Sequence, residues 1–140
     1  MYTIVLILHS WLRWAALALG LASTFFVLTA RDASGSSAAE RWGLFFMMVL
    51  DIQMLIGLLL YLVLSPLTAA ALQNFGAAMR DPSLRFWAVE HVSLMLVAVV
   101  LVHVGRVLAR TARTPESKRT RQLICFGLAT VAIIAAMPWP

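Results

Sequence analysis

The sequence has few charged residues and a single cysteine, and both shortages restrict what the chain can be. Only 12% of the 140 residues are charged while 62% are hydrophobic, which is far more apolar than a soluble domain of this length. The lone cysteine, Cys125, excludes an intramolecular disulfide and the Cys-x-x-Cys-His attachment of a c-type haem. We therefore expect an integral membrane protein in which any haem is held without a covalent bond to the chain.

Four apolar runs are long enough to cross a bilayer. A hydrocarbon core about 30 Å thick needs roughly 20 apolar residues per helix, and such runs lie at about 2–29, 42–64, 84–109 and 122–137. Short connections favour contact between sequential helices. The chain is therefore predicted to be one all-α domain, an antiparallel four-helix bundle, with a short interfacial helix over 68–79.

The basic residues gather on one side of this topology. Eight Lys and Arg residues fall on that side, against Arg80 and Arg85 on the other. The positive-inside rule then predicts cytoplasmic loops at 31–40 and 110–121, with both termini outside. Since the net charge of +5 is a topology signal, we expect contact with membrane lipids and none with nucleic acid. The eight residues are Arg31, Arg41, Arg106, Arg110, Arg113, Lys118, Arg119 and Arg121.

The N-terminal stretch MYTIVLILHSW is predicted to remain as the first span. It has no basic segment before its apolar run and no small-residue cleavage site after it, both of which a signal peptide would have.

Two histidines are predicted to meet inside the bilayer. His9 and His91 each lie about seven residues past the start of a span that runs inward, which places both roughly 10 Å deep. Two imidazoles at one depth in an apolar site are what bis-histidine ligation of haem b requires, so both are candidate metal and cofactor ligands. The pair could instead form an interhelical hydrogen bond or line a polar cavity, and a copper or zinc site is also open.

Arg13 follows His9 by one helical turn and shares its helix face. Its guanidinium could bind a haem propionate, but compensation of charge near mid-membrane favours a pair with Asp51 of the second span. Asp51 could otherwise accept a proton or hydrogen-bond a histidine. Arg85 and Arg80, at the outer surface, are further candidates for a propionate. Glu90 is expected to lean outward, toward Arg85 or the outer aqueous boundary.

His103 is a candidate ligand for a second haem. It follows His91 by twelve residues, about 18 Å along the helix, and Met47, Met48 or Cys125 could be its partner ligand. The side chains of the two histidines point about 120° apart, which argues against a shared face. The alternatives are a hydrogen bond from His103 to a neighbouring helix and a side chain that snorkels to the cytoplasmic surface.

Five stretches of the chain together resemble one known family. They are LHSWLRW (8–14), DIQMLIGLLLYLVLSP (51–66), FGAAMRDPSLRFWAVEH (75–91), HVGR (103–106) and AAMPWP (135–140). The group they resemble consists of small bacterial four-span membrane proteins labelled cytochrome b-like. That resemblance implies haem b, with His9 and His91 as axial candidates, in the bacterial inner membrane. The spacing of His91 and His103 is shorter than is usual in membrane b-cytochromes, which favours one haem.

The function expected from these features is electron transfer by haem b. Two histidine ligands leave no open position on the iron, which suits an electron carrier better than a catalyst. The redox partner could be a quinone, a periplasmic carrier or another subunit, and a homodimer could share the haem. The alternatives are a cofactor-free accessory subunit of a larger membrane complex and a small proton-coupled transporter that uses Asp51 or Glu90.

Overall fold

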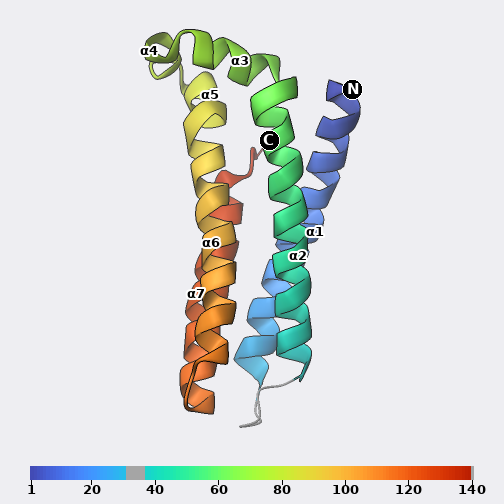
Figure 1. The fold of residues 1–140 in the computed structure, drawn as a ribbon, viewed down its shortest axis with the longest axis vertical. Coiled ribbons are helices and arrows are strands. Elements are labelled where there is room, and N and C mark those ends of the chain that lie inside the picture. The colour runs from blue at the N-terminus through green and yellow to red at the C-terminus, as the bar shows by residue number, and fades with distance from the viewer. Residues whose placement is uncertain (31–36, 140) are drawn as a thin grey trace.

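The computed structural model describes residues 1–30 and 37–139, in which all regular elements are helices. Four long helices stand side by side. Two short helices, Pro66–Gln73 and Phe75–Ala78, lie across one end of the bundle, and we call them the cross-piece (Figure 1). The elements are α1 (Tyr2–Thr29), α2 (Ser37–Leu59), η1 (Leu60–Leu64), α3 (Pro66–Gln73), α4 (Phe75–Ala78), α5 (Pro82–Arg85), η2 (Phe86–Glu90), α6 (His91–Arg110) and α7 (Pro115–Ala136). The predicted all-α four-helix bundle is confirmed.

The order of the long helices around the bundle follows the order of the sequence. The α1 helix packs against α2 and α7, and α6 packs against the same two helices. Sequential helices are therefore neighbours, as predicted, and α1 and α6 lie on a diagonal. Inward-facing side chains of these two helices can meet across the interior.

The four helices that could span a membrane match the predicted runs at most of their ends. They comprise Tyr2–Thr29, Ala38–Leu64, Pro82–Arg110 and Pro115–Ala136, each long and apolar enough to cross a bilayer. The last helix extends beyond the apolar run that starts at residue 122, because it begins at Pro115. The Thr114 side chain accepts the Ser117 N–H at 3.1 Å, and proline suits the first helical position. Basic residues assigned to the loop thus form the first turns of α7.

The cross-piece is two short helices where one was predicted over 68–79. The first, α3, begins earlier, at Pro66, after the N-cap Ser65, whose side chain accepts the Thr68 N–H. The second, α4, starts after Asn74, whose side chain accepts the Ala77 N–H at 3.2 Å. Asn74 interrupts the helix because its side chain caps the next turn and its own backbone leaves the helical region.

The tightest packing lies in the half of the bundle farther from the cross-piece. Phe46 and Phe126 are fully buried there, with ring centroids 6.1 Å apart and planes nearly perpendicular, an arrangement that aromatic quadrupoles favour. Glycines bring the helices together beside them. A Cβ on Gly105 would lie 2.6 Å from the Cβ of Cys125, and one on Gly20 would lie 2.8 Å from the Thr130 hydroxyl oxygen.

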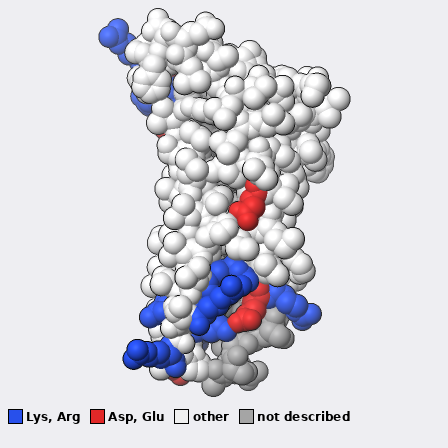
Figure 2. All heavy atoms as spheres, viewed as in Figure 1, with Lys and Arg blue, Asp and Glu red and all other residues white. Residues whose placement is uncertain are grey.

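The end of the bundle opposite the cross-piece carries most of the basic side chains (Figure 2), and we call it the basic end. Lys118 forms an ion pair with Glu40 there, and Arg106 donates a hydrogen bond to the Glu40 carbonyl oxygen at 3.3 Å. Arg119 donates to the Leu28 carbonyl oxygen at 2.6 Å. These contacts tie the ends of α1, α2, α6 and α7 together. Arg31, predicted on the same side, lies outside the described residues.

Substitution of Gly105 tests the close approach of α6 and α7. Gly105→Ala should lower the free energy of unfolding by about 1–3 kcal/mol, because the added methyl group overlaps Cys125 and pushes the helices apart. Gly127→Ala is the control, since a Cβ there meets no atom within 4 Å, and it should be neutral or stabilising by up to about 1 kcal/mol. Equilibrium unfolding in mixed micelles measures both, and equal effects would contradict the close packing.

Candidate functional site

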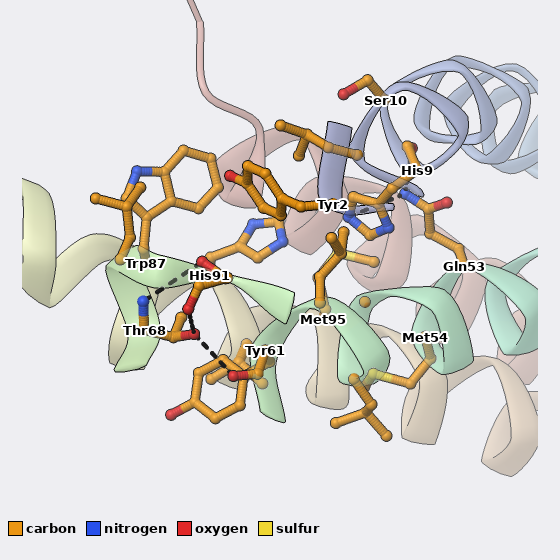
Figure 3. Close-up of a pocket in the computed structure, with 17 residues that line it drawn as sticks. Tyr2, His9, Ser10, Gln53, Met54, Tyr61, Thr68, Trp87, His91 and Met95 are labelled. Carbon is orange, nitrogen blue, oxygen red and sulfur yellow. Dashed lines mark hydrogen bonds between the residues drawn. The ribbon is translucent and has the colours of Figure 1, made fainter. Parts of the chain in front are cut away.

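A cavity of about 360 Å³ lies between α1, α2, η1 and α6 in the half of the bundle next to the cross-piece. Its volume falls within the range of cofactor and small-molecule sites. The wall is mainly apolar, and polar groups such as His9, Gln53, Tyr61, Thr68 and His91 interrupt it (Figure 3). This combination suits a flat or elongated apolar ligand held by a few directed polar contacts.

Two π-helical segments form the part of the wall nearest the cross-piece. In η1 the Ser65 N–H bonds to the Leu60 carbonyl oxygen at 2.8 Å, five residues back, and η2 has the same pattern from His91 to Phe86. The Tyr61 hydroxyl donates to the Ala88 carbonyl oxygen at 2.8 Å and so links the two segments. Single π turns occur often at functional sites because each inserts one extra residue and redirects its neighbours.

His9 and His91 meet on the cavity wall, as their matched depths predicted. Their ring centroids are 6.2 Å apart with planes inclined at 72°, and Figure 3 shows the rings side by side. Gly57 of α2 makes room for the first ring, since a Cβ there would lie 3.1 Å from His9 Cε1. A second cavity of about 70 Å³ also contacts both histidines and extends to Arg13 and the end of α7.

The hydrogen bond of His91 fixes the state of its ring. Its Nδ1 lies 2.8 Å from the Ala136 carbonyl oxygen, and because a carbonyl can only accept, Nδ1 carries the proton. In the neutral ring, Nε2 then presents a lone pair. The carbonyl is free to accept because α7 ends at Ala136, one residue before the Met137-Pro138 turn. The rings of Trp87 and His91 pack with centroids 5.4 Å apart.

His9 is held from α2 by the buried side chain of Gln53. The Gln53 amide nitrogen donates to the His9 carbonyl oxygen at 2.9 Å and lies 3.4 Å from His9 Nε2. Since the backbone carbonyl requires a donor, the nitrogen of this amide must face α1. The opposite atom, Gln53 Oε1, then points elsewhere in the site.

Three buried polar atoms of this site have no hydrogen-bond partner. They are His9 Nδ1, Arg13 Nε and Gln53 Oε1, and they are the full set of such side-chain atoms in the described part of the chain. Native proteins pair more than about 90% of buried polar groups, so three unpaired atoms in one place call for an explanation. A ligand or ordered water that bonds to them supplies one.

The predicted ion pair between Arg13 and Asp51 is wrong. The Asp51 carboxylate Oδ2 lies 3.5 Å from His103 Nε2, and within residues 1–30 and 37–139 Arg13 forms no ion pair. Its guanidinium carbon instead lies 5.1 Å from the centre of the Trp14 ring. The reason is helix rotation. Gln53 faces α1, so Asp51, two residues earlier and about 200° away around α2, must face away from it.

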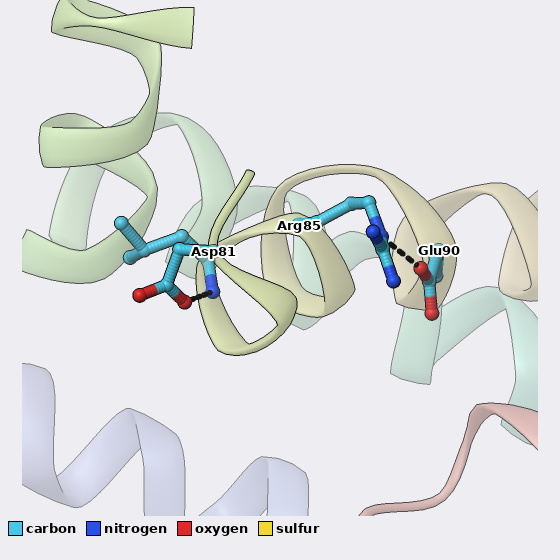
Figure 4. Close-up of polar contacts among 4 residues, drawn as sticks. Asp81, Arg85 and Glu90 are labelled. Carbon is cyan, nitrogen blue, oxygen red and sulfur yellow. Dashed lines mark hydrogen bonds and ion pairs between the residues drawn. The ribbon is translucent and has the colours of Figure 1, made fainter. Parts of the chain in front are cut away.

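Arg85 and His103 stand apart from the site. The Arg85 Nε donates to Glu90 Oε1 at 2.7 Å, which is one of the two alternatives predicted for Glu90, and both side chains are nearly half exposed (Figure 4). Neither Arg85 nor His103 lines the two cavities. The structure thus brings His9, Arg13 and His91 together.

The sequence did not predict the roles of Gln53, Gly57, Tyr61 and Trp87 in the cavity wall. The one signal in the sequence was that Gln53 is a polar residue within an apolar span. In the structure its side chain is buried, at 3% exposed. No three His, Cys, Asp or Glu side chains converge anywhere in residues 1–30 or 37–139, and a closed zinc site needs four protein ligands.

The two tyrosines of the chain offer a matched test of the link between η1 and η2. Tyr61→Phe should lower the free energy of unfolding by about 1–2 kcal/mol, because the buried Ala88 carbonyl loses its donor. Tyr2→Phe is the control, since the Tyr2 hydroxyl makes no hydrogen bond with the described residues although it borders the same cavity. Unfolding curves that shift equally for the two variants would contradict the link.

Comparison of the chain with protein-family models, with curated proteins and with solved structures found no match. The resemblance to cytochrome b-like proteins therefore stays a prediction, and the case for a function depends on the residues of the site.

Proposed function

We propose that the chain is a haem b-binding membrane protein that carries electrons, with His9 and His91 as the two axial ligands. The observation that carries the proposal is the 6.2 Å separation of their ring centroids. Bonds from a metal to imidazole nitrogen are about 2.0 Å long. When two such bonds are in line, they and the distance from each nitrogen to the centre of its ring place the two ring centroids about 6 Å apart. Two histidines on diagonal helices can therefore hold one iron.

The hydrogen bond of His91 supports the same assignment. Donation from Nδ1 to the Ala136 carbonyl oxygen orients the ring and leaves Nε2 as the ligating atom, as in most metal-bound histidines. His9 is held less firmly, by Gln53 and beside Gly57. Its unpaired Nδ1 is consistent with a ring whose polar contacts are completed by a ligand.

Arg13 and the cavity supply the other contacts that haem b needs. The apolar wall suits the macrocycle, and Arg13, at the edge of the smaller cavity with an unpaired Nε–H, suits a propionate. When bound, haem b supplies reversible one-electron chemistry at an iron with no open position. The residues of the chain hold and orient it and exclude water.

The basic end supports an orientation for the protein in a bacterial inner membrane. Seven of the eight basic residues counted from the sequence lie at that end among the described residues. The positive-inside rule places such an end in the cytoplasm. Both termini, the cross-piece and the histidine pair then lie toward the outer side, where a quinone or a periplasmic carrier could exchange electrons.

The absorption spectrum of the purified protein tests the ligand assignment. Protein expressed with a haem supply should show a low-spin b-type spectrum. His9→Ala and His91→Ala should each lower the haem bound per chain by at least about tenfold, because even residues that only orient a ligand are typically worth that much. His103→Ala is the matched control and should retain the spectrum, since His103 lies outside the cavity wall. A colourless wild type, or a spectrum lost in His103→Ala, would contradict the proposal.

Arg13 has its own test, with Arg85 as the control. Arg13→Gln should weaken haem retention by about tenfold, because a charged hydrogen bond to a propionate is lost. Arg85→Gln should have a smaller effect, since Arg85 already pairs with Glu90. Titration of haem into the apoprotein measures the haem dissociation constant of each variant. A larger loss of haem affinity for Arg85→Gln would assign the propionate to Arg85.

A further inference from the structure

An ionisable pair, Asp51 and His103, lies on the outside of the bundle within the membrane-spanning region. The two residues belong to α2 and α6, their closest atoms are 3.5 Å apart, and their side chains are 40% and 46% exposed. Asp51 is thirteen residues from each end of the Ala38–Leu64 helix, about 20 Å along its axis. Asp51 therefore lies at the middle of its span, while His103 lies seven residues before the end of α6 at Arg110, about 10 Å along its axis.

The side chains around this pair are apolar and exposed. Met48 and Leu55 flank Asp51 along one face of α2, and Val100 and Val107 flank His103 along α6, with exposed fractions between 48% and 68%. We call these six residues the Asp51–His103 face. Figure 2 shows an isolated acidic group in the otherwise uncharged middle of the molecule. Ionisable residues within spans almost always face the bundle interior or a water-filled cavity, so a pair facing lipid is anomalous.

The pair also has hydrogen-bonding capacity that the chain does not use. His103 Nδ1 donates to the Val99 carbonyl oxygen at 2.9 Å, so the proton between the two residues belongs to His103 Nε2 or to Asp51. Their 3.5 Å separation is longer than a good hydrogen bond. Hydrocarbon offers neither a donor nor an acceptor in its place. A protein surface on this face can offer both.

We propose that a second copy of the chain covers the Asp51–His103 face in a two-fold symmetric dimer. The face is self-complementary, because whichever of Asp51 and His103 holds the shared proton can donate and the other can accept. A two-fold axis between α2 and α6 would set Asp51 against the partner's His103, and the same contact would occur twice. None of the six residues lines the histidine cavities, so the dimer stands independently of the haem proposal.

Cysteine cross-linking in membranes tests which face is covered. In a Cys125→Ala background, at least one of Leu55→Cys and Val100→Cys, whichever lies nearer the two-fold axis, should form disulfide-linked dimers on mild oxidation. Val131→Cys is the control, because Val131 is equally exposed, at 60%, but lies on α7. Efficient dimers from at least one face position and only background from Val131→Cys support the proposal. No dimers from either face position, or equal dimers from Val131→Cys, would overturn it.

Removal of the polar pair tests whether it holds the dimer together. Dimerisation of labelled protein in lipid vesicles, followed by energy transfer on dilution, should weaken about tenfold in the Asp51→Leu/His103→Leu double variant, because two equivalent interhelical contacts are lost. Glu90→Gln, which breaks an ion pair elsewhere, should leave dimerisation unchanged. Circular dichroism confirms that each variant is folded. A folded double variant that dimerises like the wild type, or a monomeric wild type that binds only a different subunit, would overturn the second copy.

Discussion

Hydrocarbon offers no hydrogen bonds, and this one constraint accounts for most of the structure. Every polar group within the spans must find its partner in protein. The backbone meets the requirement by forming helices, and side chains such as Ser23 and Thr130 donate to carbonyls four residues back, at 2.6 and 2.8 Å. Where α7 ends, the Ala136 carbonyl receives its donor from His91. The end of α7 thus fixes the imidazole ring of His91 on α6. The polar groups that lack a good partner lie in two places, at the histidine cavities and on the Asp51–His103 face.

The fold could be predicted because hydrophobic length and topology dominate it. Residues 2–29 form the first helix as predicted, since nothing but length and apolar character determines it. Helix ends outside the apolar runs were harder, because local capping decides them, as Thr114 does for α7 and Asn74 does between α3 and α4. The π-helical segments had no signal in the sequence, and the hydrogen bond that links them, from the Tyr61 hydroxyl to the Ala88 carbonyl oxygen, joins residues 27 positions apart.

The sequence predicted how deep the site residues lie in the bilayer, but not which neighbouring helix each side chain faces. Counting residues from the span ends placed His9 and His91 at one level, and they do meet. The same counting wrongly joined Arg13 to Asp51, because depth alone does not tell which neighbour a side chain faces. The two polar residues in the middle of α2 narrow the choice. Gln53 and Asp51 are two positions apart, so they lie about 200° apart around the helix and cannot both face α1.

That separation gives α2 two different roles on opposite faces. Through Gln53 and Gly57 it positions His9 on the interior side, while Asp51 reaches His103 on the exterior side. A polar group is costly on either face, and each face is incomplete within a single chain. Inside, three atoms lack partners, and outside, the loose pair of Asp51 and His103 is exposed. A ligand would complete the first and another protein surface the second.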